Sequence, residues 1–519
     1  MTNGNGAATR SRRKTVEQVS HDVRSSGLKR ALGPIHLVML GIGAIIGAGI
    51  YVLTGHAAAD FAGPAVLLSF IFAGLACTFT GLCYAELSST LPVSGSAYTY
   101  SYATLGETAA WTTGWLMVLE LGVAVALVAV GFSGYVVSFL RDFGIVIPPE
   151  LTTSFINLTT AAEGATFSAG HGFNLVAALG VCLTTFILLH GVSESARVNA
   201  VIVIIKIAVL IGFVIIGMWW IEPDNWVPFI PENEGGFAYG WPGVFRAASV
   251  IFFAYIGFET VATAASEAKN PQRDLPIGIL GSLVICTIIY IAVAGVLTGV
   301  VPFRQLGVPD PIAVAVNAMN LPWFSTLVKI GAIAGLASVM LSTTYGQSRV
   351  FHTMSRDGLL PPVFSTVHPR YQTPYAGTLL LGALIALTAG LLPINILADL
   401  VSLGTAMAFG IVCLSVMWLR SAHPELERPF RVPLGGIWVG RVWIGLVPVL
   451  GIIFCLVMVV PLVGDIYGKA RSGDPLPAIL LLGYLAIGAA IYLFYGRRHS
   501  RLAQPQTGAV DTTLVTEER

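Results

Sequence analysis

Charged residues are scarce in this sequence. Lys, Arg, Asp and Glu together make up 11% of the 519 residues, whereas soluble domains have about 25%. Hydrophobic residues make up 55%, and the mean hydropathy is +0.79. Because a folded chain cannot hide all of its surface from water, this composition excludes an ordinary soluble enzyme. The net charge of +1 gives no basic field that would attract nucleic acid, so we expect no nucleic-acid partner.

Cysteine is scarce too, and the chain has no CxxC pair. All six cysteines lie in apolar stretches, so we expect small buried hydrophobic residues and neither disulfides nor metal ligands: Cys77, Cys83, Cys182, Cys286, Cys413 and Cys455. The histidines have no metal-binding spacing, and no nucleophile–base set or phosphate loop stands out. The sequence therefore predicts no enzyme, no metal site and no bound cofactor.

Long apolar blocks dominate the chain instead. About 20 apolar residues cross the hydrocarbon core of a bilayer, and twelve blocks have roughly that length: 35–58, 63–88, 108–139, 173–191, 196–220, 242–266, 276–300, 322–350, 375–392, 395–420, 440–463 and 476–495. We therefore expect an all-α polytopic membrane protein with twelve transmembrane helices. Its membrane domain spans 35–495, and the polar tails 1–34 and 496–519 are expected to be disordered and cytoplasmic.

The positions of Lys and Arg predict the orientation. With the N-terminus inside, the inner segments hold 21 of these residues and the outer loops hold four, with three more inside spans. Cytoplasmic loops are enriched in Lys and Arg. This bias predicts a multi-pass protein of the plasma membrane with both termini in the cytoplasm.

Two blocks contain features that interrupt a helix. The segment 41–49 has four glycines in nine residues, each weakening a helix by about 1 kcal/mol relative to Ala; close packing through small residues is the alternative interpretation. The sixth block has Gly257 and Glu259 in mid-span. If blocks one to five and six to ten are inverted repeats, these interruptions correspond, which is typical of a transporter's central site. The free N–H groups of a broken helix suit a carboxylate and its free carbonyls an ammonium, so together they indicate a zwitterionic amino acid.

Several motifs, in order along the chain, resemble the amino acid–polyamine–organocation superfamily. Those shared with the superfamily are Gly43–Ile50, Pro92–Tyr100, Gly114-Trp115, Phe252–Glu259 and Glu267–Pro276. The segments 345–349 and 354–361 look like the cationic amino acid transporter subfamily. The resemblance covers about 30–495. It implies a LeuT-like fold of two inverted five-helix repeats, about 35–220 and 242–420, with helices 1 and 6 broken, plus two extra helices over about 440–495.

The resemblance also implies the substrate-binding residues. The amides of Ala48 and Gly49 would hold a substrate carboxylate, and the carbonyls of three residues would hold its ammonium group. The ring of Phe253 would close over the substrate, and Gly47 and Gly257 would be the helix breaks. The full predicted set is Ile45, Gly47, Ala48, Gly49, Phe253, Ala254, Ile256 and Gly257, with Ile45, Phe253 and Ile256 supplying the carbonyls.

Lys206 is the most informative single residue. It lies roughly 15 Å along the fifth span, at 1.5 Å per residue, and an intramembrane lysine is a functional-site hypothesis by default. By resemblance, a lysine here takes the place of a sodium ion, which implies sodium independence and proton coupling. Ser338 would be its neighbour on the eighth span, and Ala337 lacks a hydroxyl there. The alternative is a structural cation that satisfies backbone carbonyls.

Other polar residues within the spans have two interpretations each. Glu120 would pair with a cationic substrate or act as a hydrogen-bonded acid between helices. Glu259 would hydrogen-bond the broken helix or carry a proton. Leu336 aligns with a side-chain pocket and favours a smaller or neutral substrate, which conflicts with the subfamily name. Arg246 and Lys329 are expected to snorkel toward the outer surface.

The sequence thus predicts a secondary active L-amino acid transporter that works by alternating access, through proton-coupled symport or exchange, and without sodium. A channel or facilitative uniporter, or a transporter of a polyamine or another amine-bearing metabolite, is the alternative. A membrane sensor would need a large cytosolic output domain, which the sequence lacks. A small single-span partner is compatible with the sequence but leaves no sign in it. The charge of the substrate stays open.

Overall fold

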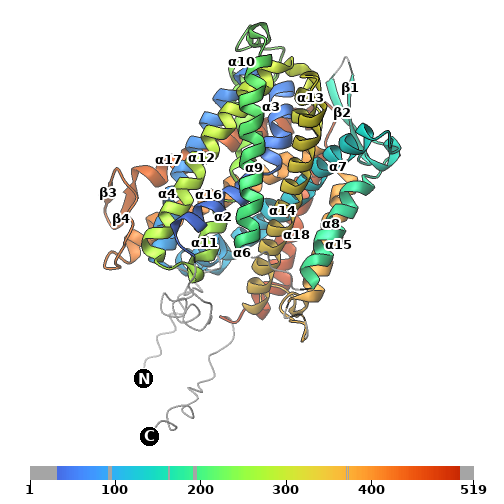
Figure 1. Cartoon of the computed structure of the whole chain (residues 1–519). Coiled ribbons are helices and arrows are strands. Elements are labelled where there is room, and N and C mark those ends of the chain that lie inside the picture. Colours follow the sequence, from blue (N-terminus) through green and yellow to red (C-terminus); the bar gives the residue numbers. More distant parts are fainter. Residues whose placement is uncertain are drawn as a thin grey trace, which may run out of the picture.

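The computed structural model describes residues 32–91, 96–161, 164–190, 196–369, 371 and 373–502. Most of the expected tails, and residues 92–95 of one motif, lie outside these ranges. Within them, nine helices are long and apolar enough to cross a membrane, and two shorter apolar helices accompany them. Figure 1 shows these helices gathered in one bundle.

The first half of the bundle runs from the first interrupted segment to the lysine-bearing helix. Its elements are α2 (Pro34–Ile45), α3 (Thr54–Ala57), α4 (Val66–Thr90), α5 (Ser96–Thr104), α6 (Glu107–Met117), α7 (Ala124–Asp142), α8 (Leu175–Leu189) and α9 (Ala196–Gly217). A π-helical segment, Val118–Val123, joins α6 to α7, so these helices form one long span.

The second half begins with the second interrupted segment. Its elements are α10 (Gly240–Ile251), α11 (Thr260–Thr263), α12 (Pro271–Val300), α13 (Pro311–Ala318), α14 (Pro322–Arg356), α15 (Tyr375–Leu391), α16 (Ile394–Ala422), α17 (Leu446–Arg471), α18 (Leu476–Ile491) and α19 (Arg497–His499). Helix α13 is short and lies in the loop before α14.

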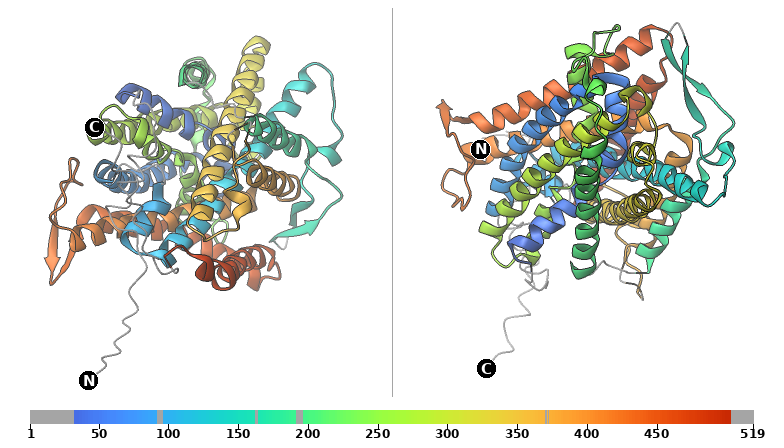
Figure 2. Two further views of the ribbon diagram at one scale, coloured as in Figure 1. Left: turned by 90° about the horizontal axis from the view of Figure 1, so that it is seen from below. Right: turned by 45° about the horizontal axis from the view of Figure 1, so that its top comes forward.

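The expectation of an all-α chain is wrong in two loops. Strands β1 (Ile156–Ala161) and β2 (Gly164–Ala169) form one antiparallel hairpin, and β3 (Gly436–Val439) and β4 (Val442–Gly445) form another. The β3–β4 turn places Gly440 at φ +62°, which a tight two-residue hairpin turn requires and glycine allows. This hairpin projects from the side of the bundle (Figure 2).

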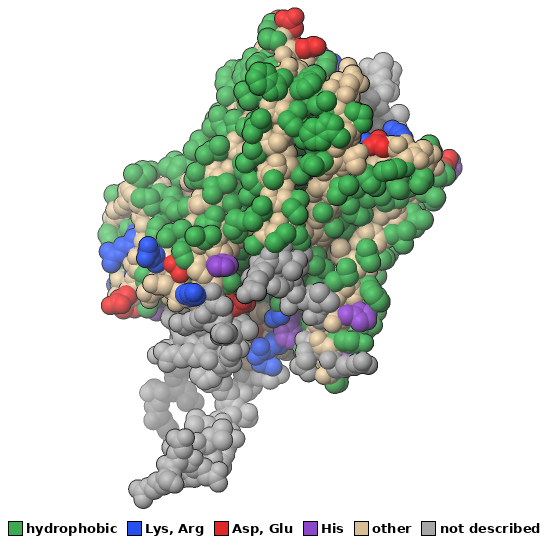
Figure 3. Space-filling model, viewed as in Figure 1, with side chains coloured by type: hydrophobic (Ala, Val, Ile, Leu, Met, Phe, Trp, Pro, Cys, Tyr) green, Lys and Arg blue, Asp and Glu red, His purple; other side chains and the backbone are tan. Residues whose placement is uncertain are grey.

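Apolar side chains cover much of the outer surface of the bundle (Figure 3). On α8, for example, Leu179, Leu183 and Phe186 are 57–59% exposed. Their spacing places them on one helix face, and large exposed apolar surfaces mark a membrane or partner contact. The same helix corrects one expectation, because Cys182 is exposed there while the other five cysteines are buried.

The two cations expected to snorkel do not. Arg246 on α10 is buried and binds Asp399 of α16 at 2.7 Å and Asp465 of α17 at 3.0 Å. Lys329 on α14 is buried and binds Asp142 of α7 at 2.6 Å. Each cation therefore joins neighbouring helices through an ion pair.

Candidate functional site

The first interruption follows α2. The amide of Ile46 donates the last bond of this helix to Ile42 at 2.9 Å, and Ile46 then turns to an extended conformation with ψ 97°. A π-helical segment, Gly49–Leu53, resumes the helix. The first amides of a helix have no partner within it, and among the described residues no acceptor reaches the amides of Ala48 and Gly49. This break therefore leaves N–H groups available inside the bundle.

The second interruption follows α10, which continues as a 3-10 turn, Phe252–Tyr255. Ile256 then leaves the helical conformation with ψ 136°, and Gly257 has φ +125°. A side chain disfavours this region, whereas glycine enters it readily. The carboxylate of Glu259 accepts the Gly257 amide at 2.9 and 3.1 Å, so it caps the break.

The two interruptions touch each other through their backbones. A Cβ atom on Gly257 would lie 2.5 Å from the carbonyl carbon of Ala44, and one on Gly49 would lie 2.2 Å from the Cα atom of Ala254. Such distances leave no room for a methyl group. All eight residues of the predicted substrate site are buried here, so the fold brings them together in the interior.

The three predicted ammonium-binding carbonyls differ in their partners. The carbonyl of Ile45 accepts the Tyr290 hydroxyl at 2.8 Å, and that of Phe253 accepts the Ile256 amide at 3.0 Å. Among the described residues, no hydrogen-bond donor reaches the carbonyl of Ile256. Tyr290 therefore competes for one predicted ligand, and sequence reasoning missed it because it lies 245 residues away.

Lys206 on α9 reaches the first interruption. Its Nζ donates to the carbonyls of Gly43 at 2.9 Å and Ile46 at 3.1 Å, and the side chain is fully buried. The aliphatic stem packs against α14, because a Cβ on Gly335 would lie 3.2 Å from the lysine Cε. Leu336 and Ser338 follow on α14 and are buried. The lysine thus satisfies carbonyls that the end of α2 leaves unpaired.

Glu120 lies in the π-helical segment between α6 and α7, where Gly404 of α16 packs against its backbone. Its carboxyl oxygens are buried and have no hydrogen-bond partner among the described residues. The ring of Tyr84 lies 5.5 Å from that of Phe258, and the Tyr84 hydroxyl is also buried without a described partner. Two polar side chains without a described partner, those of Glu120 and Tyr84, are therefore buried in the bundle, and Tyr84 lies beside the second interruption.

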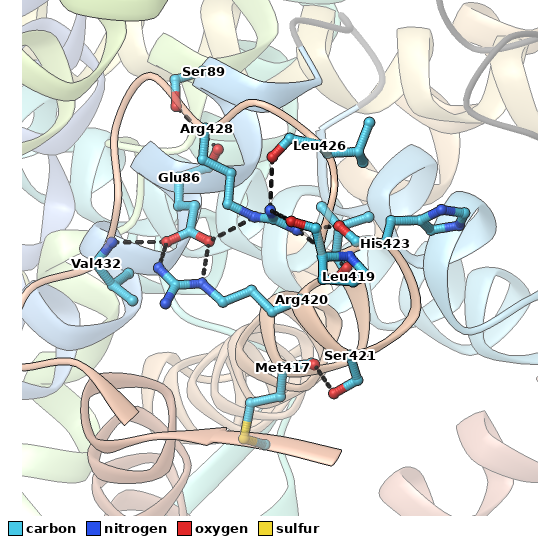
Figure 4. Close-up of polar contacts among 11 residues, drawn as sticks. Glu86, Ser89, Met417, Leu419, Arg420, Ser421, His423, Leu426, Arg428 and Val432 are labelled. Carbon is cyan, nitrogen blue, oxygen red and sulfur yellow. Dashed lines mark hydrogen bonds and ion pairs between the residues drawn. The ribbon is translucent and has the colours of Figure 1, made fainter. Parts of the chain in front are cut away.

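Sequence reasoning also missed a charged cluster between α4 and the loop that follows α16 (Figure 4). The buried Glu86 carboxylate accepts Arg420 Nε at 2.7 Å and the Val432 amide at 2.7 Å. Arg428 donates to the carbonyls of His423 and Leu426 at 2.6 and 2.7 Å. A glutamate at the end of an apolar block was the one available signal. This cluster fixes the loop against the end of α4.

The described residues contain no group of three His, Cys, Asp or Glu side chains that could hold a metal ion. The chemistry that this interior offers is instead backbone N–H and carbonyl groups, one buried ammonium and two carboxyl groups.

Comparison with known proteins gives three informative relatives. The chain is 41% identical to the methylthioribose transporter of Bacillus subtilis (strain 168), over 95% of this chain and 98% of the relative. It is 42% identical to the branched-chain amino acid permease BcaP of the same organism, over 95% and 99%. It is 37% identical to the vacuolar cationic amino acid transporter 4 of Arabidopsis thaliana, over 80% and 67%.

The family model described as "Amino acid permease" matches residues 32–487. This range contains both interruptions, Lys206 and the helices that surround them. The match and the full-length relatives agree with the resemblance carried by the glycine-rich segment and by the segment around Gly257. The chain therefore belongs to the amino acid permease family, within the amino acid–polyamine–organocation superfamily.

Proposed function

We propose that this protein is a secondary active transporter of L-amino acids that works by alternating access and is not an enzyme. The observation that carries this proposal is the pair of interrupted helices, which leaves the amides of Ala48 and Gly49 and the carbonyl of Ile256 without described partners. Backbone N–H groups at a helix start bind carboxylates, and a carbonyl accepts from an ammonium group. One buried locus then holds both ends of an α-amino acid.

The proposed architecture is a LeuT-like arrangement with twelve spans. The nine long helices include one continuous stretch, Pro34–Thr90, that contains two predicted spans, and α8 and α15 supply two more. Interruptions in the first and sixth spans are the pattern of inverted-repeat transporters. The proposed location is the plasma membrane, with both termini in the cytoplasm.

Lys206 supports sodium-independent transport coupled to protons or to exchange. Its ammonium already occupies the carbonyls at the end of α2, where a cation is needed. A lysine that loses its proton binds those carbonyls more weakly, and this would let the two halves of the first span move more easily. Glu120 and Glu259 are further candidates for carrying a proton, because both carboxyl groups are buried.

The first substrates to test are neutral branched-chain amino acids. Leu336, which by resemblance lines the side-chain pocket, is a bulky apolar residue buried on α14 and favours a neutral side chain. BcaP matches this chain almost end to end. Methylthioribose is the second candidate, because a relative of that name is 41% identical. Methylthioribose has neither a carboxylate nor an ammonium, so it would not use the free amides in the same way.

Counterflow in proteoliposomes tests this proposal. Vesicles loaded with unlabelled leucine should accumulate labelled leucine, and arginine, putrescine and methylthioribose serve as competitors. A proton gradient should drive net uptake, while a sodium gradient should not. Accumulation of none of these compounds would overturn the transporter proposal, and accumulation of methylthioribose alone would replace the substrate class.

The role of Lys206 needs its own variants. Lys206→Ala should abolish uptake or remove its pH dependence, because the carbonyls of Gly43 and Ile46 lose their cation. Lys269→Ala, which removes an exposed lysine before α12, is the matched control and should transport normally. Unchanged, still pH-dependent uptake by Lys206→Ala would exclude a coupling role.

A further inference from the structure

An open groove of about 680 Å³ lies at one end of α12, and its lining residues belong to neither interrupted segment. One wall is the start of α12 and the other is the loop after α16. The lining residues are Asn270, Gln272, Arg273, Pro276, Ile277, Leu280, Gly281, Pro429 and Phe430. The substrate proposal uses none of them.

The groove is polar and basic at one end. Arg273 is exposed, and among the described residues no acidic side chain pairs with it. Lys269 and Arg431 are exposed next to lining residues in the chain. Asp274 is buried and accepts the Asn270 amide at 3.2 Å, so its carboxylate is already engaged. Among the described residues, no carboxylate lines the groove, and its open end therefore suits an anionic group.

The rest of the groove is apolar and leads toward the lipid-facing surface. Ile277 and Leu280 continue along α12 into the exposed side chains of Val284, Ile285 and Ile288. Ile277 also lines a second groove of about 420 Å³ between α2, α9 and α12. Its described lining residues are all apolar: Pro34, Ile35, Val38, Met39, Ile42, Ile207, Ile277 and Ile285. Ile277 thus lies between a groove with a basic end and a groove whose described lining is apolar.

The loop wall of the groove is held in place. Pro429 and Phe430 stand between Arg428, which binds carbonyls at the end of α16, and Val432, whose amide donates to Glu86 (Figure 4). A wall fixed on both sides of the lining residues needs little reordering to bind a ligand, and preorganisation of this kind favours affinity.

We propose that this groove binds one anionic phospholipid of the cytoplasmic leaflet. Its phosphate lies at Arg273, and its two acyl chains lie on either side of Ile277. The matching features are the basic end, the apolar floor and the continuity with lipid-facing side chains, and basic residues at the cytoplasmic surface attract anionic lipids by about 1 kcal/mol each. The proposal shares with the proposed function only its orientation in the membrane, and its test reads binding in place of transport.

Mass spectrometry of the intact purified chain in detergent tests this site. Phosphatidylglycerol should form a one-lipid complex that survives dilution, while phosphatidylcholine with the same acyl chains should bind several-fold more weakly. Arg273→Gln should weaken the phosphatidylglycerol complex about five-fold. Arg441→Gln, an exposed arginine in the β3–β4 turn, should not change it.

Three results would overturn the site. These are equal binding of the two lipids, unaltered binding by Arg273→Gln, and displacement of the lipid by inorganic phosphate, which would identify a free anion as the ligand. Leu280→Trp fills the apolar part of the groove, leaves Arg273 in place and should also weaken the complex. This second variant keeps the test valid if one of the two variants fails to fold. Leucine counterflow by Arg273→Gln in phosphatidylcholine vesicles should match the unmodified protein, which separates this test from that of transport.

Discussion

Gly257 is the residue whose missing side chain matters most to the candidate site. Its φ of +125° and the backbone of Ala44 both reject a Cβ atom. We expect Gly257→Ala to destabilise the protein by about 1–3 kcal/mol and to abolish uptake, as measured by thermal unfolding in detergent and by counterflow. Gly483→Ala is the matched control, because nothing lies within 4 Å of a Cβ there. Normal uptake by Gly257→Ala would show that the close contact is dispensable.

Substitutions of Glu259 can distinguish its two proposed roles, which are capping the interrupted helix and carrying a proton. The side chain accepts the Gly257 amide through its oxygens, and Glu259→Gln keeps one such oxygen but cannot release a proton. If capping is its role, Glu259→Gln should transport nearly normally and Glu259→Ala should lose most uptake. If the carboxylate carries a proton, the Gln variant should retain exchange but lose proton-driven accumulation. Equal, normal accumulation by both variants would contradict either role.

The sequence predicted residues whose effect is local, such as glycines that interrupt their own helix. It did not predict contacts between residues that are far apart in the chain. Gly47 and Gly257 stand out because glycine in mid-span weakens a helix wherever it packs. Arg246 was misread because its partners lie 153 and 219 residues away, and in sequence it looks like any cation near a span end. For the same reason the sequence could suggest a carbonyl-binding role for Lys206 but could not name Gly43 and Ile46.

At the scale of elements, the loop after α16 is held by one carboxylate. Glu86 is almost fully buried, and its removal leaves Arg420 and Arg428 without their acid. We expect Glu86→Gln to destabilise the protein by about 3 kcal/mol, as for other broken buried ion pairs, in thermal unfolding in detergent.

A surface ion pair is the control for that loop. Arg304 and Glu234 form a pair in which both side chains are more than half exposed, and such pairs contribute about 0–1 kcal/mol. Glu234→Gln should therefore leave the unfolding temperature almost unchanged. Similar losses in both variants would mean that burial does not set the strength of the Glu86 cluster.

Helices were easier to predict from the sequence than the segments between them. Apolar blocks mark helices because lipid forces every backbone group to bond within its own helix. That constraint ends in the loops, where β1–β2, β3–β4 and α13 form without a long apolar block to indicate them. The structure still explains the residue type in one of these loops, because Gly440 occupies the position of the β3–β4 turn that needs a positive φ.

At the scale of the whole molecule, the deficit of charge correctly indicated a membrane protein, but composition alone cannot give a span count. The shortest span candidates, α8 with 15 residues and α15 with 17, fall below the usual length for crossing a bilayer. Whether they cross decides between twelve spans and fewer. The repeat symmetry of the proposed fold depends on that count, because each repeat needs five crossings.

Cysteine labelling at positions 304 and 441 tests this count for the part of the chain between them. Three candidate spans, α14, α15 and α16, lie between them, together with the short loop helix α13. Three crossings would place the two positions on opposite faces. In a chain whose six native cysteines are replaced by serine or alanine, Arg304→Cys should react with a membrane-impermeant maleimide in intact cells. Arg441→Cys should react only after permeabilisation. Labelling of both in intact cells would mean that one of the three helices, with α15 the shortest, does not cross, and the reverse pattern would invert the proposed orientation and with it the leaflet assigned to the lipid groove.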